Sequence, residues 1–161
     1  MGVTRVTKEQ LARSAWELLV AYTFSQRSAL ADIARELGLT PGHTKTLLEL
    51  DPDEGRSMGE LATVLACDAS NATWLVDRLE ERGLVERQPH PGDRRVKSVV
   101  LTPEGAKTRA LLIERLATPP EDLATLDRAD LEALLDALGR LPPHPPFWSP
   151  AHRSATGAPT G

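Results

Sequence analysis

Cysteine and the usual signatures of metal, cofactor and enzyme sites are scarce in this chain. One cysteine, Cys67, stands among 161 residues, which excludes a disulfide framework within the chain. The four histidines, His43, His90, His144 and His152, lack the spacing of metal ligands, so we predict no metal site. Glycine-rich phosphate loops and nucleophile elbows are also missing. We therefore expect no catalytic residue, no cofactor and no enzymatic activity.

Long apolar runs are absent too. No stretch approaches the roughly 20 apolar residues that a transmembrane helix needs. The N-terminus also lacks a basic segment followed by an apolar one, which would mark a signal peptide. We therefore expect a soluble, cytoplasmic protein with no membrane partner. Its 161 residues suffice for one domain, or for a compact domain with helical extensions.

Positive charge is not in excess either. The 19 lysines and arginines are outnumbered by 23 aspartates and glutamates, which gives a formal net charge of -4, whereas a stand-alone nucleic-acid binder is often basic. Residues 84–101 depart from this balance. If this segment contacts DNA, we expect few phosphate contacts per subunit and an affinity that falls quickly with salt. Its basic residues are Arg87, Arg94, Arg95 and Lys97, and its acidic ones are Glu86 and Asp93.

Residues 57–83 have the pattern of two short helices joined by a turn. Ser57 and Glu60 have the spacing of a capping box, and apolar residues follow at helical intervals to about residue 66. Asp68 then has the position of a second N-cap, opening a helix over residues 69–82 that ends at Gly83. Two short helices joined by a turn of about three residues make a helix-turn-helix.

The second of these helices divides into two faces. The spacing of Ala72, Leu75, Val76 and Leu79 predicts that they are buried. Short hydrogen-bonding side chains near the N-terminus of the other face are typical of a helix that meets base edges and phosphates in a major groove, although a solvated polar face is the simpler alternative. The outward residues are Ser70, Asn71, Thr73, Trp74 and Arg78.

Two β-prone segments, residues 83–87 and 96–101, flank a turn-rich stretch and predict a hairpin with a long basic tip. Arg94 and Arg95 at this tip can enter a minor groove or lie along phosphates, and Asp93 can hold one guanidinium group in place. A solvated loop is the alternative. A hairpin that follows a helix-turn-helix forms a winged helix. We therefore predict a mainly α fold with a small β-hairpin wing.

The N-terminal segment predicts helices. Thr7 caps an apolar stripe over residues 11–37, which is interrupted near Ser25 by weaker helix formers, so either one bent helix or two consecutive ones fit. Thr40-Pro41 opens a further short helix. Large side chains here belong either to a core or dimer interface or to the wall of an effector pocket, and the histidine is either a packing residue or a ligand contact. They are Trp16, Tyr22, Phe24 and His43.

The C-terminal segment starts with a second cap-then-proline signal at residues 102–103 and is interrupted at Pro119-Pro120. A last helix opens at Asp127 and carries more leucine than a small winged body can cover, so we expect the same helix of a second subunit as its partner. Its stripe is Leu131, Leu134, Leu135, Leu138 and Leu141. The proline-rich tail is predicted to be extended and flexible. In it, Phe147 and Trp148 either pin the tail to the dimer surface or take part in effector or partner binding.

The motifs CDASNATWLVDRLEERGLVER, GDRR and VVLTPEG, in this order, resemble the multiple-antibiotic-resistance regulator (MarR) family over about residues 11–141. This resemblance implies a bacterial homodimeric transcription regulator, most often a repressor, whose terminal helices intertwine and whose winged helices bind an inverted-repeat operator. It further implies that Ser70, Asn71, Thr73 and Trp74 lie in the major groove, that Arg78 lies near the DNA backbone or braces the wing, and that Arg94 probes the minor groove. Trp74 departs from the smaller or basic residue that the family pattern has there.

We accordingly expect an N-terminal dimerisation region (7–38), a winged helix-turn-helix DNA-binding domain (39–102), C-terminal dimerisation helices (103–141) and a flexible tail (142–161). The expected partners are double-stranded DNA, a second copy of the chain and a small aromatic or anionic effector bound near the residues named above. Two alternatives stay open. The acidic balance would suit a winged-helix protein-interaction module without sequence-specific DNA binding. Cys67 at a helix N-terminus would suit a redox sensor, although the neighbouring Asp68 and the lack of a second cysteine favour a packing role.

Overall fold

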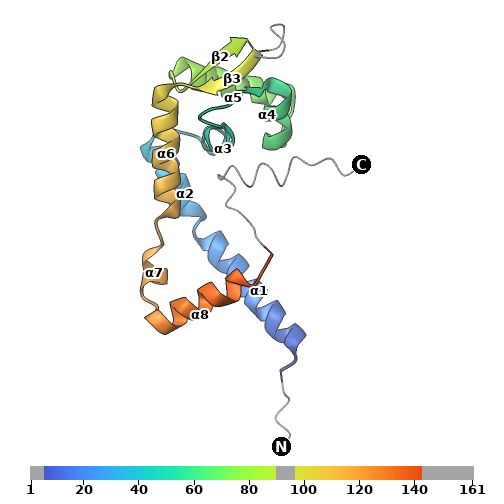
Figure 1. The fold of residues 1–161 in the computed structure, drawn as a ribbon, viewed down its shortest axis with the longest axis vertical. Helices are drawn as coiled ribbons and strands as arrows, with labels where there is room; N and C mark the ends of the chain where they lie inside the picture. The colour runs from blue at the N-terminus through green and yellow to red at the C-terminus, as the bar shows by residue number, and fades with distance from the viewer. Residues whose placement is uncertain (1–5, 90–96, 143–161) are drawn as a thin grey trace, which may run out of the picture.

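The computed structural model describes residues 6–89 and 97–142 and is mainly helical, with one small antiparallel sheet (Figure 1). A helix-turn-helix followed by a β-hairpin confirms the predicted fold class. The helices are α1 (Lys8–Ser25), α2 (Arg27–Glu36), α3 (Pro41–Glu49), α4 (Met58–Leu65), α5 (Ala69–Glu81), α6 (Pro103–Ala117), α7 (Glu121–Ala124) and α8 (Arg128–Gly139), and the strands are β1 (Arg56–Ser57), β2 (Val85–Pro89) and β3 (Lys97–Leu101).

The core lies between helices α3 to α6 and the sheet, at one end of the elongated molecule (Figure 1). Leu47, Leu61, Leu79 and Val99 are fully buried there. The four residues predicted for the inner face of α5 are all buried. Each buried leucine or valine contributes about 1.5–3 kcal/mol through burial, so this end of the chain holds its own apolar core.

Side-chain caps set the helix starts where the sequence predicts them. Ser57 and Glu60 form a full capping box at α4, and the Asp68 carboxylate accepts from the backbone N–H of Asn71 at α5. Between these helices Ala66 adopts a left-handed conformation with φ 54°. Gly83, directly after the C-cap of α5, has φ 68°, a conformation that glycine adopts without a Cβ penalty.

The sheet has a third strand, β1, which was not predicted from the sequence. β1 pairs with β3, Arg56 with Val99 and Ser57 with Ser98, so the strand order is β1-β3-β2. A strand of two residues is too short to show an alternating pattern. Because β1 runs directly into α4, the sheet joins the helix-turn-helix to the hairpin.

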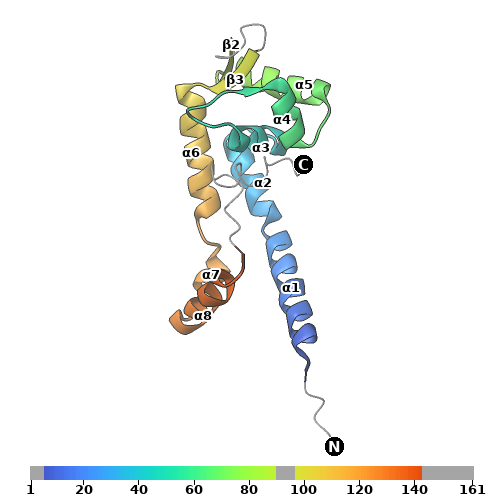
Figure 2. The ribbon, with the colours of Figure 1, turned by 45° about the vertical axis from the view of Figure 1, so that its right-hand side comes forward.

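The terminal helices lie away from this body. α8 crosses α1 in Figure 1, but Figure 2 shows the two helices apart. No residue of α1 or α8 is buried, and Trp16, Leu18 and Leu135 are 66%, 72% and 71% exposed. The N-terminal stripe forms two helices that meet at Gln26, one of the two predicted arrangements. α7 was not predicted, because two prolines and a four-residue helix give no periodicity.

In the described part of the chain, no helix has both the length and the apolar character to cross a membrane. The tail from residue 143, with Phe147 and Trp148, lies outside the described residues, as do Arg94 and Arg95 at the hairpin tip.

Candidate nucleic-acid interface

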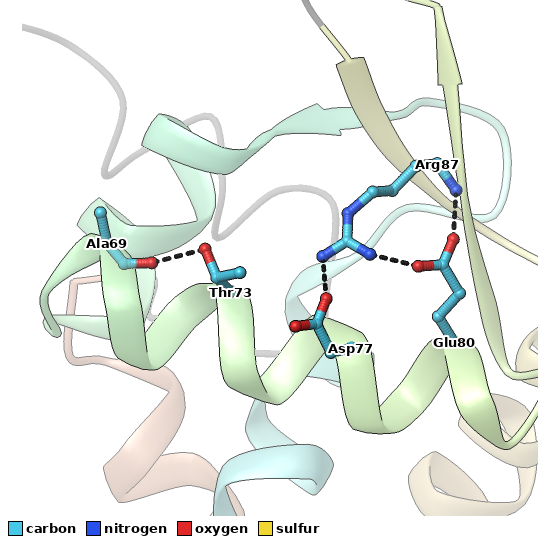
Figure 3. A network of polar contacts seen from close by, with 5 residues as sticks. All are labelled: Ala69, Thr73, Asp77, Glu80 and Arg87. Atoms are coloured by element: carbon cyan, nitrogen blue, oxygen red, sulfur yellow. Dashed lines mark hydrogen bonds and ion pairs between the residues drawn. The ribbon is translucent and has the colours of Figure 1, made fainter.

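The N-terminus of α5 presents the short polar side chains that the sequence singles out. The Asp68 carboxylate accepts the Ser70 hydroxyl and, at 2.8 Å, the Asn71 N–H, and these bonds hold the pKa of Asp68 below its usual value. The Thr73 hydroxyl donates to the Ala69 carbonyl at 2.8 Å, as Figure 3 shows. Ser70, Asn71 and Thr73 are all exposed. The structure therefore brings them together on one outward face of α5.

Trp74 lies on the same helix, half exposed and held by stacking. Its ring stacks on His43 of α3, with centroids 5.8 Å apart and planes at 22°. The guanidinium carbon of Arg78 lies 6.0 Å from the indole centroid, and an Arg78 nitrogen is 2.7 Å from Glu81. Arg78 therefore pairs within α5. A tryptophan supported from below by a second ring is a rigid apolar group on an otherwise polar face.

His43 itself is buried, with 7% exposure. Its Nδ1 accepts from the backbone N–H of Thr40 at 3.4 Å, so Nε2 carries the proton in the neutral ring. Burial, together with the positive charges of Arg82 and Arg78, lowers the pKa of His43. The ring beneath Trp74 is thus neutral at neutral pH.

The wing is braced against α5 by Arg87, which the sequence analysis counted only as a positive charge. Its guanidinium group bonds to Glu80 and, at 2.6 Å, to Asp77, while its backbone N–H donates to Glu80 at 3.2 Å (Figure 3). The Arg87 side chain is only 20% exposed. The sequence signal for this contact is weak: it consists of two carboxylates three residues apart on one helix, followed by a strand that carries an arginine.

We expect Arg87→Met to lower the free energy of unfolding by about 1–2 kcal/mol, because the two carboxylates on α5 lose a charge-assisted partner. Urea unfolding at fixed protein concentration measures the change. Arg128→Met is a matched control, since the Arg128 side chain is 91% exposed and pairs only within α8; it should stay within about 0.5 kcal/mol of the parent. Equal changes in the free energy of unfolding for the two variants would contradict the role of Arg87 in holding the wing against α5.

The remaining predicted residues are spread over the molecule. Lys97 is exposed at the start of β3, where it pairs with Pro89. Trp16 is exposed on α1, the Phe24 ring lies 3.6 Å from the Arg27 guanidinium carbon, and Tyr22 donates to Asp122 at 3.0 Å. Burial, and then the hydrogen bond and negative charge of Asp122, raise the pKa of Tyr22. The three aromatic residues of α1 and His43 thus have different neighbours, and the single chain does not gather them around one cavity.

Cys67 is partly buried and packs against the hydrophobic core. This position fits the packing role that the sequence favours over redox sensing. Within residues 6–89 and 97–142, no group of three or more His, Cys, Asp or Glu side chains is placed to hold a metal ion.

Comparisons with known proteins agree with this geometry. Residues 39–97 match the model of the MarR family. The chain is 31% identical over 121 residues to a Thauera aromatica protein described as a transcriptional regulatory protein for the hcr operon, covering 72% of this chain and 73% of that protein.

Two solved structures are similar to this chain. Transcriptional regulator Tm0710 from Thermotoga maritima has 27% identity and a TM-score of 0.67, covering 79% of this chain and 90% of that one. The transcriptional repressor CouR, bound to a 23-mer DNA duplex, has 31% identity and a TM-score of 0.57, covering 84% of this chain and 97% of that one.

Proposed function

This chain belongs to the MarR family of transcriptional regulators, and from that premise we propose that it is a homodimer that binds an inverted-repeat DNA operator and represses transcription. Each subunit would place α5 in a major groove and the tip of its wing in the neighbouring minor groove. The observation that carries the proposal is the outward face of α5, where Ser70, Asn71, Thr73 and Trp74 are all exposed beside a braced wing. The structure of CouR on a DNA duplex, at 31% identity, supports the same use of the fold.

The terminal helices support the dimer. Exposed leucines on α1 and α8 form apolar surfaces that the single chain leaves uncovered. A second copy would cover them with the same surfaces, as a two-fold symmetric interface does. We therefore assign residues 7–38 and 103–141 to dimerisation and residues 39–102 to DNA binding.

The negative charge of the chain is compatible with DNA binding because of how charge is arranged on α5. Asp77 and Glu80 would repel phosphates if they were free, but both are paired with Arg87. Arg78, Arg94, Arg95 and Lys97 would supply the phosphate and minor-groove contacts. With so few cations per subunit, two subunits are needed for useful affinity.

A small aromatic or anionic effector would bind between the winged and dimerisation regions. The three aromatic side chains of α1, Trp16, Tyr22 and Phe24, would line such a site on one side. On the other side, in the winged domain, His43 would lie behind Trp74, under which its ring is buried. An effector can release the protein from DNA only if it binds more tightly to a dimer whose two α5 helices have the wrong spacing.

The test is a salt-titrated binding measurement on the intergenic DNA upstream of the protein's own gene, with a scrambled duplex of the same composition as control. We expect the native duplex to bind at least about 100-fold more tightly, at two subunits per site, with the scrambled duplex losing affinity as salt rises. Equally weak binding to both duplexes, erased by salt, would contradict the proposal and favour a protein-interaction role for the winged helix.

A further inference from the structure

The C-terminus of α5 is tied directly to the end of α2 by one side chain. Arg82, the residue that follows α5, donates from Nη1 to the carbonyl of Gly38 at 2.5 Å and from Nη2 to the carbonyl of Leu37 at 2.9 Å. Arg82 lies 44 positions after Gly38 and 45 positions after Leu37 in the sequence. Gly38 has φ 65°, and a Cβ added there would lie 3.3 Å from Arg82 Nη2. The Arg82 side chain therefore packs closely against the backbone at Gly38 and leaves little room for a larger residue there.

The two acceptors are well suited to an arginine. Leu37 and Gly38 follow the last turn of α2, where carbonyl groups lack helical partners and the helix dipole is negative. A guanidinium group offers several N–H donors in a fixed plane, so it can satisfy two neighbouring carbonyls in one orientation. A lysine would supply the charge but not the two-pronged geometry.

This contact joins two parts of the molecule with different tasks. α1 and α2 form the N-terminal arm, which runs from the winged body toward the far end of the molecule (Figures 1 and 2). α5 carries the face proposed to read DNA. Apolar packing of Ile33, Ala34 and Leu37 also attaches the arm to the core, but apolar burial is not directional and tolerates small rotations. The Arg82 bonds do have a direction.

We infer that Arg82 is a positioning residue: it fixes the orientation of α5 relative to the N-terminal arm and thereby sets the distance between the two α5 helices of the dimer. This inference rests on the proposed dimeric function. The spacing of the two helices determines which half-site spacing an operator must have, because half-sites lie about one helical turn of DNA, or a multiple of it, apart. Arg82 would thus define operator geometry without reading a base.

The first test measures the distance between the α5 helices without DNA. A spin label at Ala69→Cys in a Cys67→Ser background places one probe on each α5, and pulsed dipolar spectroscopy gives the distance distribution in the dimer. We expect one narrow peak for the parent, a peak at least about twice as wide for Arg82→Met, and an intermediate width for Arg82→Lys, which keeps the charge but not the fork. Arg35→Met is the matched control: it also removes one cation from this region, but Arg35 pairs within α2 with Asp32.

An Arg82→Met peak as narrow as the parent's would overturn the inference. If Arg82→Met fails to fold by near-ultraviolet circular dichroism, the Arg82→Lys width decides instead, and a parent-like width would overturn it. A parent protein that sediments as a monomer would contradict the proposed dimer and the inference that rests on it. Sedimentation detects this outcome independently of the distance measurement.

The second test uses the half-sites that the parent selects from a random duplex library, rebuilt with the selected spacing and with spacings changed by one or two base pairs. We expect the parent to prefer the selected spacing by about tenfold or more, and Arg82→Met to prefer it by less than about threefold. A uniform loss of affinity over all spacings would show that Arg82 acts only through its charge and would overturn the positioning role. Failure of the parent to select any inverted repeat would count against the proposed function itself.

Discussion

Replacing Leu135 by aspartate is expected to produce a folded monomer that no longer binds operator DNA. Leu135 is 71% exposed on α8 in the single chain, so its loss removes little from the core of one subunit. In a dimer the same side chain would be covered, and a carboxylate there would have to be buried without a partner. The lost leucine burial, about 1.5–3 kcal/mol, and the desolvation of the new charge would apply in each subunit of a symmetric dimer.

Sedimentation velocity over a range of concentrations measures the effect directly. We expect the dimer dissociation constant to rise by at least about 1,000-fold, since two sites each lose several kcal/mol. Ala133→Asp is the matched control: it adds the same charge to α8 on the side opposite the leucine stripe, at an exposed position. It should leave the dimer intact. Dissociation by both variants alike would mean that added charge, and not the leucine surface, is responsible.

Replacing both Arg94 and Arg95 by alanine is expected to lower operator affinity by at least about 100-fold while the protein stays dimeric. Each well-placed contact of this kind contributes about 1–3 kcal/mol, and a dimer would lose the contacts of two wings. The two arginines lie outside the residues that the structure describes, so the expectation comes from their place in the sequence, between the braced strand β2 and β3.

Fluorescence anisotropy at several salt concentrations measures both the affinity and the number of phosphate contacts. The slope of log affinity against log salt should become shallower by about one for each phosphate contact removed. The control is Lys107→Ala with Arg128→Ala, which removes the same charge from two strongly exposed positions on α6 and α8. An unchanged affinity of the wing variant would remove the wing from the proposed DNA interface.

Local features were predictable from the sequence because short-range chemistry decides them. Ser57, Asp68 and Thr102 each cap a helix through a backbone N–H three residues on, so the signal and its cause lie within one turn. The buried face of α5 follows from helical periodicity in the same way. The order of the parts, two short helices followed by a hairpin, was read along the sequence in the same way, and the family resemblance added what that order implies for function.

Contacts between distant residues were not predictable in this way. Arg87 reaches Asp77 and Glu80 on another element, and Arg82 reaches backbone carbonyls that no side chain marks in the sequence. The sequence left His43 as either a packing residue or a ligand contact, and it did not indicate that the ring lies buried under Trp74. Periodicity tells which side of a helix is inward and does not tell which neighbour is met there.

The pairing of β1 with β3 also bears on how such a protein can change over evolution. Because β1 continues directly into α4, and β3 lies between β1 and β2, the base of the hairpin is held in register on both sides by residues 56–57 and 85–89. Insertions, deletions or substitutions between residues 89 and 97 would therefore leave the helix-turn-helix undisturbed. If the wing contacts DNA as proposed, changes in the segment that joins β2 to β3 would give related proteins new flanking-sequence preferences while the same α5 helix continued to read the central bases.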